Sequence, residues 1–264
     1  MRRKNAATRI AALAFRRAPG DKTGMSEIPD GQPQIKFLCD PALDGAIPKP
    51  DRAILFAPDW FKDLPREMDM KDADGNPGLT VKACLPVTDA FALGYIVPLP
   101  FEIHLRVTDR PEETQFGWPG QPPFQPLEWH HPGQIGAPGA PFGNVLPLKF
   151  INPWRITVPE GYSVLFQTPL SRPDLPFRCF SGFVDCDRFH TTINFPFLWT
   201  GGKGDHVLPA GLPIAQLVPV RRDTLLRDHA ARASTPEELA EQADATHRKY
   251  HSESAYAREW RVKK

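Results

Sequence analysis

The sequence predicts a mainly β protein of short antiparallel strands, arranged as a sandwich or barrel of the jelly-roll type. First, its 264 residues include 31 prolines and 19 glycines, and proline both breaks helices and removes N–H groups that the central strands of a parallel sheet need. Second, strand-length apolar segments alternate with turn residues from position 79 to 220, a spacing typical of such β folds. Third, hydrophobic residues make up 41% of the chain, enough for one filled core.

The chain divides into three regions. Residues 1–34 form a basic extension, residues 35–220 a single β domain, and residues 221–264 a helical tail. Residues 1–24 hold seven basic side chains and one acidic one, so they look like a targeting peptide. Because the coherent pattern begins only near Ile35, we favour a disordered extension, with Met25 as the true start.

Charge and cysteine content exclude several classes of function. The net charge is +1, and the +6 of residues 1–24 and the +2 of residues 221–264 leave −7 for residues 25–220. A body of that sign is a poor nucleic-acid binder. No run of 18 apolar residues occurs, so no membrane partner is expected. Four cysteines without a CxxC pair fit neither a zinc module nor a disulfide framework, which favours a reducing cytoplasm.

The Pro-rich part, residues 35–147, predicts one short helix and three strands. The helix is expected at 59–64, after Pro58, and the strands at 79–87, 92–97 and 100–107. Residues 109–147 then form a long connection with nine prolines, a length typical of functional loops. It contains Trp129, His130, His131 and Gln134, which we expect to form a lid or wall of a site.

The barrel block, residues 148–220, predicts seven strands separated by turn signals. In the tail, Thr235 and Glu238 form a capping box with Pro236 at the first helical position, so a helix begins there. We expect this helix to lie on the barrel or on a neighbouring subunit. The seven strands are expected at 148–151, 155–158, 162–168, 177–184, 191–199, 205–208 and 213–220.

Candidate site residues lie in this block. Asp185 and Asp187 follow Gly182 and two apolar residues and alternate in strand sense, so both are expected to face one side of a pocket. A carboxylate there can bind a sugar hydroxyl or orient water. Gln216 lies in an apolar strand, where a buried amide needs a ligand or a backbone partner. The alternative is that Asp185 and Gln216 only satisfy local backbone groups.

Three segments, 159–172, 181–190 and 208–219, resemble in order and spacing the trimeric dUTPase and dCTP deaminase superfamily. The matching motifs are Pro-x-Ser, Gly-apolar-apolar-Asp and Gly-x-x-apolar-Ala-Gln, and they place Ser171, Asp185 and Gln216 on family positions. The resemblance implies a dUTPase-like barrel, phosphate contacts from Ser171 and Gln216, and sugar and water contacts from Asp185. The sequence departs from the family at Arg172, in place of glycine, and at Arg188, in place of an aromatic residue.

A second resemblance covers nearly all of residues 35–264. The phrases KFINPWRITVPEGYSVLF, SGFVDCDRFHTTINFPFLWT and PAGLPIAQLVPVRR are similar to those of a bacterial and phage domain family of unknown function. This resemblance implies no particular chemistry. It favours a divergent use of the barrel over a conventional dUTPase.

We therefore predict a cytoplasmic β-barrel protein that binds a small phosphorylated ligand such as a nucleotide. Hydrolysis of that ligand is the second form of this prediction. Asp185 is the catalytic candidate, and the substrate-binding candidates are Ser171, Arg172, Arg188 and Gln216, the arginines because they suit phosphate. Mg²⁺ is the cofactor that such a ligand would bring, and a homo-oligomer is expected. Whether the protein is an enzyme is left open.

Two alternatives come from other classes of protein. His130, His131 and His190, with Asp185 or Asp187, offer the ligand types of a cupin-like Fe(II) oxygenase. A Pro-rich jelly roll with an N-terminal arm also suits a non-enzymatic capsid, tail or binding module.

Overall fold

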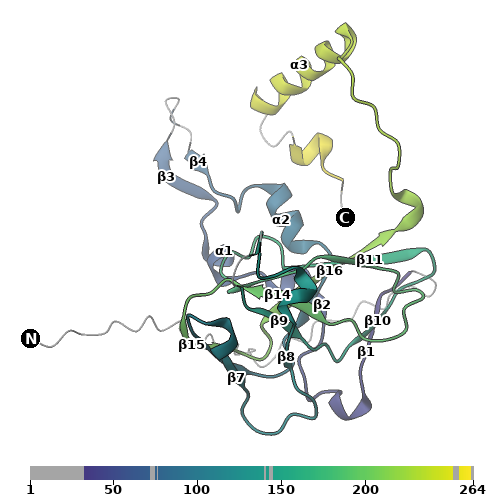
Figure 1. Cartoon of the computed structure of the whole chain (residues 1–264). Coiled ribbons are helices and arrows are strands. Elements are labelled where there is room, and N and C mark those ends of the chain that lie inside the picture. The colour runs from purple at the N-terminus through teal and green to yellow at the C-terminus, as the bar shows by residue number, and fades with distance from the viewer. Residues whose placement is uncertain are drawn as a thin grey trace, which may run out of the picture.

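The structure, a computed structural model, describes residues 33–71, 75, 77–139, 141–142, 145–251 and 256–262. The predicted N-terminal extension thus lies almost wholly outside the described residues. Within them the chain forms sixteen strands in antiparallel pairs, a few short helices and one helix of sixteen residues (Figure 1). The predicted mainly β class is confirmed.

A five-stranded sheet carries the candidate site residues, and its longest strand is β16. Its first five residues are all buried, so both faces of the strand are covered at this end; β5 pairs along this end, and β11 pairs from Gln216 onward. This explains why its sequence is almost continuously apolar. The strand order is β13-β11-β16-β5-β2, with β2 at Asp51–Arg52, β5 at Tyr95–Pro98, β11 at Tyr162–Gln167, β13 at Gly182–Val184 and β16 at Pro213–Arg221.

The remaining strands form four smaller sheets. One has the order β12-β14-β9-β8, with β8 at Leu127–Trp129, β9 at Pro147–Phe150, β12 at Phe177–Cys179 and β14 at Phe195–Trp199. Another has the order β15-β6-β7, with β6 at Ile103–Val107, β7 at Gln115–Gly117 and β15 at Gly204–Leu208. Two ribbons pair β1 (Lys36–Leu38) with β10 (Arg155–Thr157) and β3 (Glu67–Lys71) with β4 (Pro77–Leu79).

The main core lies between these sheets. At its centre three fully buried rings meet: Phe150 stacks on Phe197 with 4.1 Å between ring centroids, and Phe177 lies 5.1 Å from Phe150. These rings come from β9, β12 and β14, and they share one cluster with Val164 of β11 and Leu217 of β16. The apolar faces of the two larger sheets are therefore buried together.

A smaller cluster supports the helices of the N-terminal part. Helix α1, Asp59–Asp63, confirms the predicted short helix, and its Phe61 ring lies 4.2 Å from Phe91 of α2, Leu85–Ala92. The 3₁₀ turns of the chain are η1 at Pro41–Leu43, η2 at Ala53–Phe56, η3 at Pro111–Glu113, η4 at Pro132–Ile135 and η5 at Arg222–Thr224.

The predicted strand over 79–87 is wrong. Strand β4 ends at Leu79, and helix α2 begins at Leu85. Pro86 lies in the first turn of this helix, where a missing N–H costs nothing because the first N–H groups of a helix have no internal partner.

Two other predicted strands are too long, and the predicted long connection is not structureless. Residues 177–184 divide into β12 and β13, which join different sheets, and the strand predicted over 191–199 begins only at Phe195. Residues 109–147 contain β7 and β8, which extend two sheets. Pairing with neighbouring strands, which sequence periodicity does not reveal, decides these boundaries.

The arrangement is a set of open sheets. None of the sheets formed by the described residues closes on itself, so the jelly-roll or dUTPase-like barrel stays a prediction. No helix within these residues has both the length and the apolar character needed to cross a bilayer.

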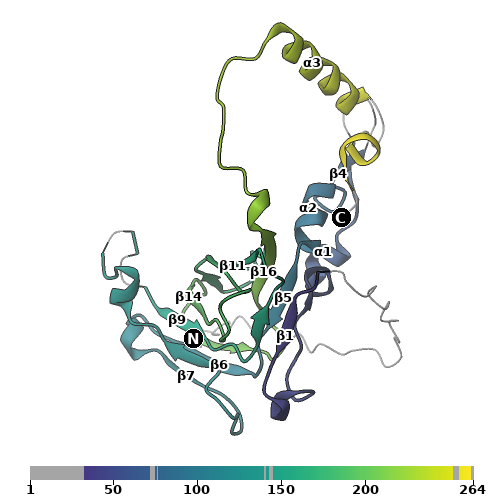
Figure 2. The same cartoon turned by 90° about the vertical axis from the view of Figure 1, so that its right-hand side faces the viewer.

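The tail forms the predicted helix, α3, at Pro236–His251. Its capping box is present: the Glu238 N–H donates to Thr235 Oγ1 (3.3 Å), and the Thr235 N–H donates to the Glu238 carboxylate (2.8 Å). Figures 1 and 2 show α3 standing away from the sheets at the end of an extended linker. A short π-helix, η6, follows at Tyr256–Trp260.

Candidate functional site

The predicted site residues lie at two separate places along the β11–β16 strand pair. In the register of the pair, Ser163 lies opposite Val220, and Gln167 lies opposite Gln216. Asp185 bonds to Ser163, so it lies four residues along β11 from Gln216, a separation of about 13 Å. A single chain therefore does not bring Asp185 next to Gln216.

Asp185 belongs to a network with Ser163, Asp187 and Arg222, which we call the Arg222 network. The Ser163 hydroxyl donates to Asp185 Oδ1 at 2.5 Å. Arg222 Nη1 donates to Ser163 Oγ (3.1 Å), to Asp187 Oδ1 (3.0 Å) and, more weakly, to Asp185 Oδ1 (3.4 Å). Arg222 Nη2 donates to the second Asp187 oxygen. The guanidinium thus joins the end of β16 to both aspartates.

The backbone around Asp185 explains how the two aspartates reach one cation. Strand β13 ends at Val184, and the chain then turns, with the N–H groups of Arg188 and Phe189 both donating to the Asp185 carbonyl at 2.9 Å. The aspartates therefore converge through a turn. The predicted reason, alternation along a strand, is wrong.

The two aspartates differ in exposure and in role. The Asp187 side chain is 3% exposed and also accepts the Gly161 N–H at 2.9 Å. Hydrogen bonding from Arg222, supported by the Gly161 N–H, lowers the pKa of Asp187 to about 2. The Asp185 side chain is 59% exposed, and within the described part of the chain its Oδ2 accepts no hydrogen bond. Asp187 is structural, whereas Asp185 is held in place with one oxygen open to solvent.

Cys186, between the aspartates, is fully buried in the main core. Burial, with the negative charges of Asp185 and Asp187 on either side, raises the pKa of this thiol to about 11. It is therefore protonated at neutral pH and unsuited to act as a nucleophile.

Among the described residues, the hydrogen-bond partners of the Gln216 side chain are all backbone groups. Its side chain is 2% exposed; Oε1 accepts the Leu170 N–H at 2.7 Å, and Nε2 donates to the carbonyls of Leu93 (2.6 Å) and Ala90 (3.3 Å). Gln216 thus ties the end of α2 and the turn at 170 to β16. This geometry favours the alternative in which the amide satisfies local backbone groups.

Ser171 and Arg172 lie beside Gln216 in the turn that follows β11. Ser171 has φ +55°, a left-handed conformation that a non-glycine residue rarely adopts. The Arg172 guanidinium is 10% exposed; it binds the Asp174 carboxylate and donates to the Phe56 carbonyl at 3.1 Å. Arg172 therefore holds this turn against η2, and its charge is already paired.

Arg188 is an exposed residue of the turn after Asp185. Of the four predicted substrate-binding residues, it is the one that lies next to Asp185 in the fold. Ser163 and Arg222 were missed by sequence reasoning, although two aspartates flanking a core cysteine already call for a nearby cation.

The histidines show no shared site. Among the described residues, no group of three or more His, Cys, Asp or Glu side chains could hold a metal ion. His131 Nδ1 accepts the Gly133 N–H at 3.1 Å, in a capping box with Gln134. Burial, with the nearby Lys149 charge, lowers the pKa of His130. The structure does not bring His130, His131 and His190 together with a carboxylate.

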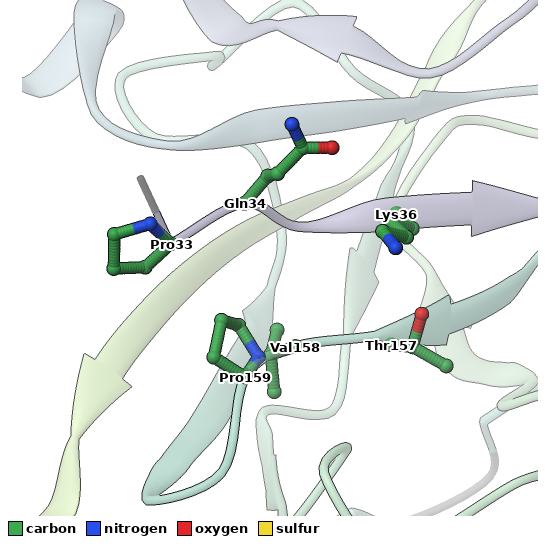
Figure 3. A pocket seen from close by; sticks show the side chains of 6 residues that line it. All are labelled: Pro33, Gln34, Lys36, Thr157, Val158 and Pro159. Carbon is green, nitrogen blue, oxygen red and sulfur yellow. The ribbon is translucent and has the colours of Figure 1, made fainter. Parts of the chain in front are cut away.

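A surface hollow of about 500 Å³ lies beside the β1–β10 ribbon. Figure 3 shows Pro33 and Pro159 at one end of it, with Lys36 and Thr157 further along. Gln34 and Val158 complete the lining, and none of the predicted site residues contributes to it.

Compared with models of known protein families, the sequence matches none, and no curated protein matches it significantly.

Proposed function

We propose that the protein binds a small phosphorylated ligand with free hydroxyl groups, such as a nucleotide, at Asp185. The observation that carries the proposal is the state of this carboxylate. Its Oδ1 is fixed by Ser163 and Arg222, while the side chain as a whole is 59% exposed. An exposed carboxylate that is already held in one orientation suits a sugar hydroxyl or a water molecule, because binding does not have to restrict the conformations of its side chain.

Arg188 supplies the charge for a phosphate in this proposal. It lies three residues after Asp185 on the same turn and is exposed. Arginine binds phosphate oxygens through two parallel hydrogen bonds. Hydrolysis of the ligand would use Asp185 to orient the attacking water, with Mg²⁺ arriving on the phosphates.

Asp185 and the Ser171–Gln216 turn lie apart in one chain, and this separation affects whether one ligand contacts both places. In this proposal, the two places contact one ligand from different copies of the chain in a homo-oligomer, because a single chain separates them by four residues along β11. We further propose that the open sheets are a divergent form of the dUTPase-like or jelly-roll barrel, since β11, β13 and β16 carry the motifs that resemble that superfamily.

The test is thermal unfolding with a panel of nucleotides, nucleosides and pyrophosphate, with and without Mg²⁺. A ligand at a hundred times its Kd should raise Tm by about 5 °C or more. We expect Asp185→Asn to abolish most of this shift for the binding nucleotide, because the hydroxyl loses its charged acceptor.

Asp205→Asn is the matched control. Asp205 is 73% exposed and pairs with Arg106 on another sheet, so its loss should leave the ligand-induced shift unchanged. A panel without any stabilising ligand, or equal shifts for the wild type and Asp185→Asn, contradicts the proposal.

A further inference from the structure

The β1–β10 ribbon has an apolar inner face and a polar outer face. On the inner face, Ile156 belongs to the main core, and Ile35 and Phe37 pack against it, so the ribbon is anchored to the body. Lys36 lies opposite Thr157 in the register of the ribbon, and side chains alternate between the two faces of a strand. Lys36 and Thr157 therefore share the outer face, where both line the hollow of about 500 Å³.

The charged residues of the ribbon strands are both cations, Lys36 in β1 and Arg155 in β10, and both are exposed. Arg155 lies opposite Leu38, which places it diagonally across the outer face from Lys36, with roughly 7–8 Å between the residues. Among the described residues neither cation forms an ion pair, not even with the exposed Glu160 that follows β10. Because residues 25–220 carry a net charge of −7, this face is a positive patch on an acidic domain.

Uncharged hydrogen-bonding groups accompany these cations. Gln34 lies two residues before Lys36, so it continues the outer face, and both Gln34 and Thr157 line the hollow. Within the described part of the chain, neither of these two side chains has a hydrogen-bond partner. Figure 3 shows the Thr157 hydroxyl turned towards Lys36. An ammonium, a hydroxyl and an amide without partners therefore border one hollow.

The turn that joins β10 to β11 fixes one end of the hollow. Pro159 lines the hollow, and its carbonyl accepts the Tyr162 N–H at 3.2 Å. Within this turn the Gly161 N–H donates to the Asp187 carboxylate, and the Gly161 carbonyl accepts the Arg222 N–H, both at 2.9 Å. The backbone around the hollow is therefore held in place before any ligand arrives, so binding does not have to order it.

We propose that this hollow binds a small ligand through a phosphate group, at a site separate from Asp185. The three terminal oxygens of a phosphate group match the Lys36 ammonium, the Thr157 hydroxyl and the Gln34 amide, whereas a carboxylate has one oxygen fewer. Arg155 binds a second phosphate group through two parallel hydrogen bonds. Small-molecule sites have volumes of about 300–1,000 Å³, so the hollow also has room for the organic part of such a ligand.

The test is isothermal titration calorimetry of the full-length protein with pyrophosphate, inorganic phosphate and succinate as probes. Pyrophosphate should bind most tightly, because it presents phosphate oxygens to both cations. Lys36→Ala should raise the Kd for pyrophosphate about tenfold or more, since a charged hydrogen bond is lost. Lys36→Glu should abolish binding, because it places a carboxylate beside the anion.

Two control variants make the result specific to the hollow. Lys36→Arg keeps the positive charge and should retain most of the affinity for pyrophosphate. Lys203→Ala also removes one positive charge, but Lys203 is 66% exposed and pairs with Asp109 away from the ribbon, so the affinity should stay at the wild-type value. Because Lys36 is exposed, its variants should unfold at the wild-type Tm in the absence of a probe, which shows that the fold is intact.

Asp185→Asn separates this proposal from the one for the nucleotide, because it should leave pyrophosphate binding in the hollow unchanged. The proposal is overturned if neither pyrophosphate nor phosphate binds at millimolar concentration, or if Lys36→Glu binds pyrophosphate as tightly as the wild type does. Tighter binding of succinate than of pyrophosphate overturns it too, since the hollow would then select carboxylates.

Discussion

Replacing Gln216 with leucine is expected to lower the free energy of unfolding by about 3 kcal/mol. Leucine fills nearly the same volume but leaves the Leu170 N–H and the Leu93 carbonyl without their partner, and both bonds are short, at 2.7 and 2.6 Å. A buried backbone group without a partner costs about 1–3 kcal/mol. Urea unfolding at pH 7, followed by tryptophan fluorescence, measures the difference.

Gln167→Leu is the control for this change. Gln167 lies directly opposite Gln216 on β11 and is partly buried, so the same substitution there should cost less than about 1 kcal/mol. If Gln216 instead serves mainly as a ligand contact, Gln216→Leu will keep the wild-type stability and lose only the nucleotide-induced rise in Tm. The two results separate the structural role from the one that the dUTPase resemblance implies.

Much of the β block could be predicted because its strands are marked locally. The apolar run of β16 and the turns around β11 gave both strands to within about one residue. Helix α2 could not be predicted from periodicity, because a segment of eight mostly apolar residues has the length and composition of a buried strand. The Phe61–Phe91 contact that stabilises it is formed between elements far apart in sequence.

For the candidate site too, the sequence predicts which side chains need partners, but it does not predict which distant residues provide them. A glutamine in an apolar strand requires partners, but the sequence does not say that these are Leu170, Ala90 and Leu93. Arg222 is 35 residues from Asp187, and the two meet only because β11 pairs with both β13 and β16. Closed-barrel topology likewise depends on strand order, which local patterns do not determine.

Asp187→Asn is expected to lower the free energy of unfolding by about 2 kcal/mol at pH 7. The carboxylate is 3% exposed and bonded to Arg222 and the Gly161 N–H, and its pKa is about 2, below the ordinary value of 3.8. A depressed pKa means that the folded state binds the proton more weakly than the unfolded state. The stabilisation is therefore complete above about pH 4 and disappears as the pH falls to 2.

The pH dependence makes this prediction specific to the ionised pair. Unfolding free energies of the wild type and Asp187→Asn should differ by about 2 kcal/mol from pH 7 to 5 and converge between pH 4 and 2. Asp205→Asn removes a carboxylate whose pair with Arg106 is mostly exposed on both sides, so it should leave the free energy of unfolding close to the wild-type value. A difference for Asp187→Asn that stays constant down to pH 2 would mean that asparagine disturbs the packing around Gly161 and Cys186, and that the charge of Asp187 contributes little. Convergence would show instead that the ion pair with Arg222 fixes the turn on which Asp185 is presented.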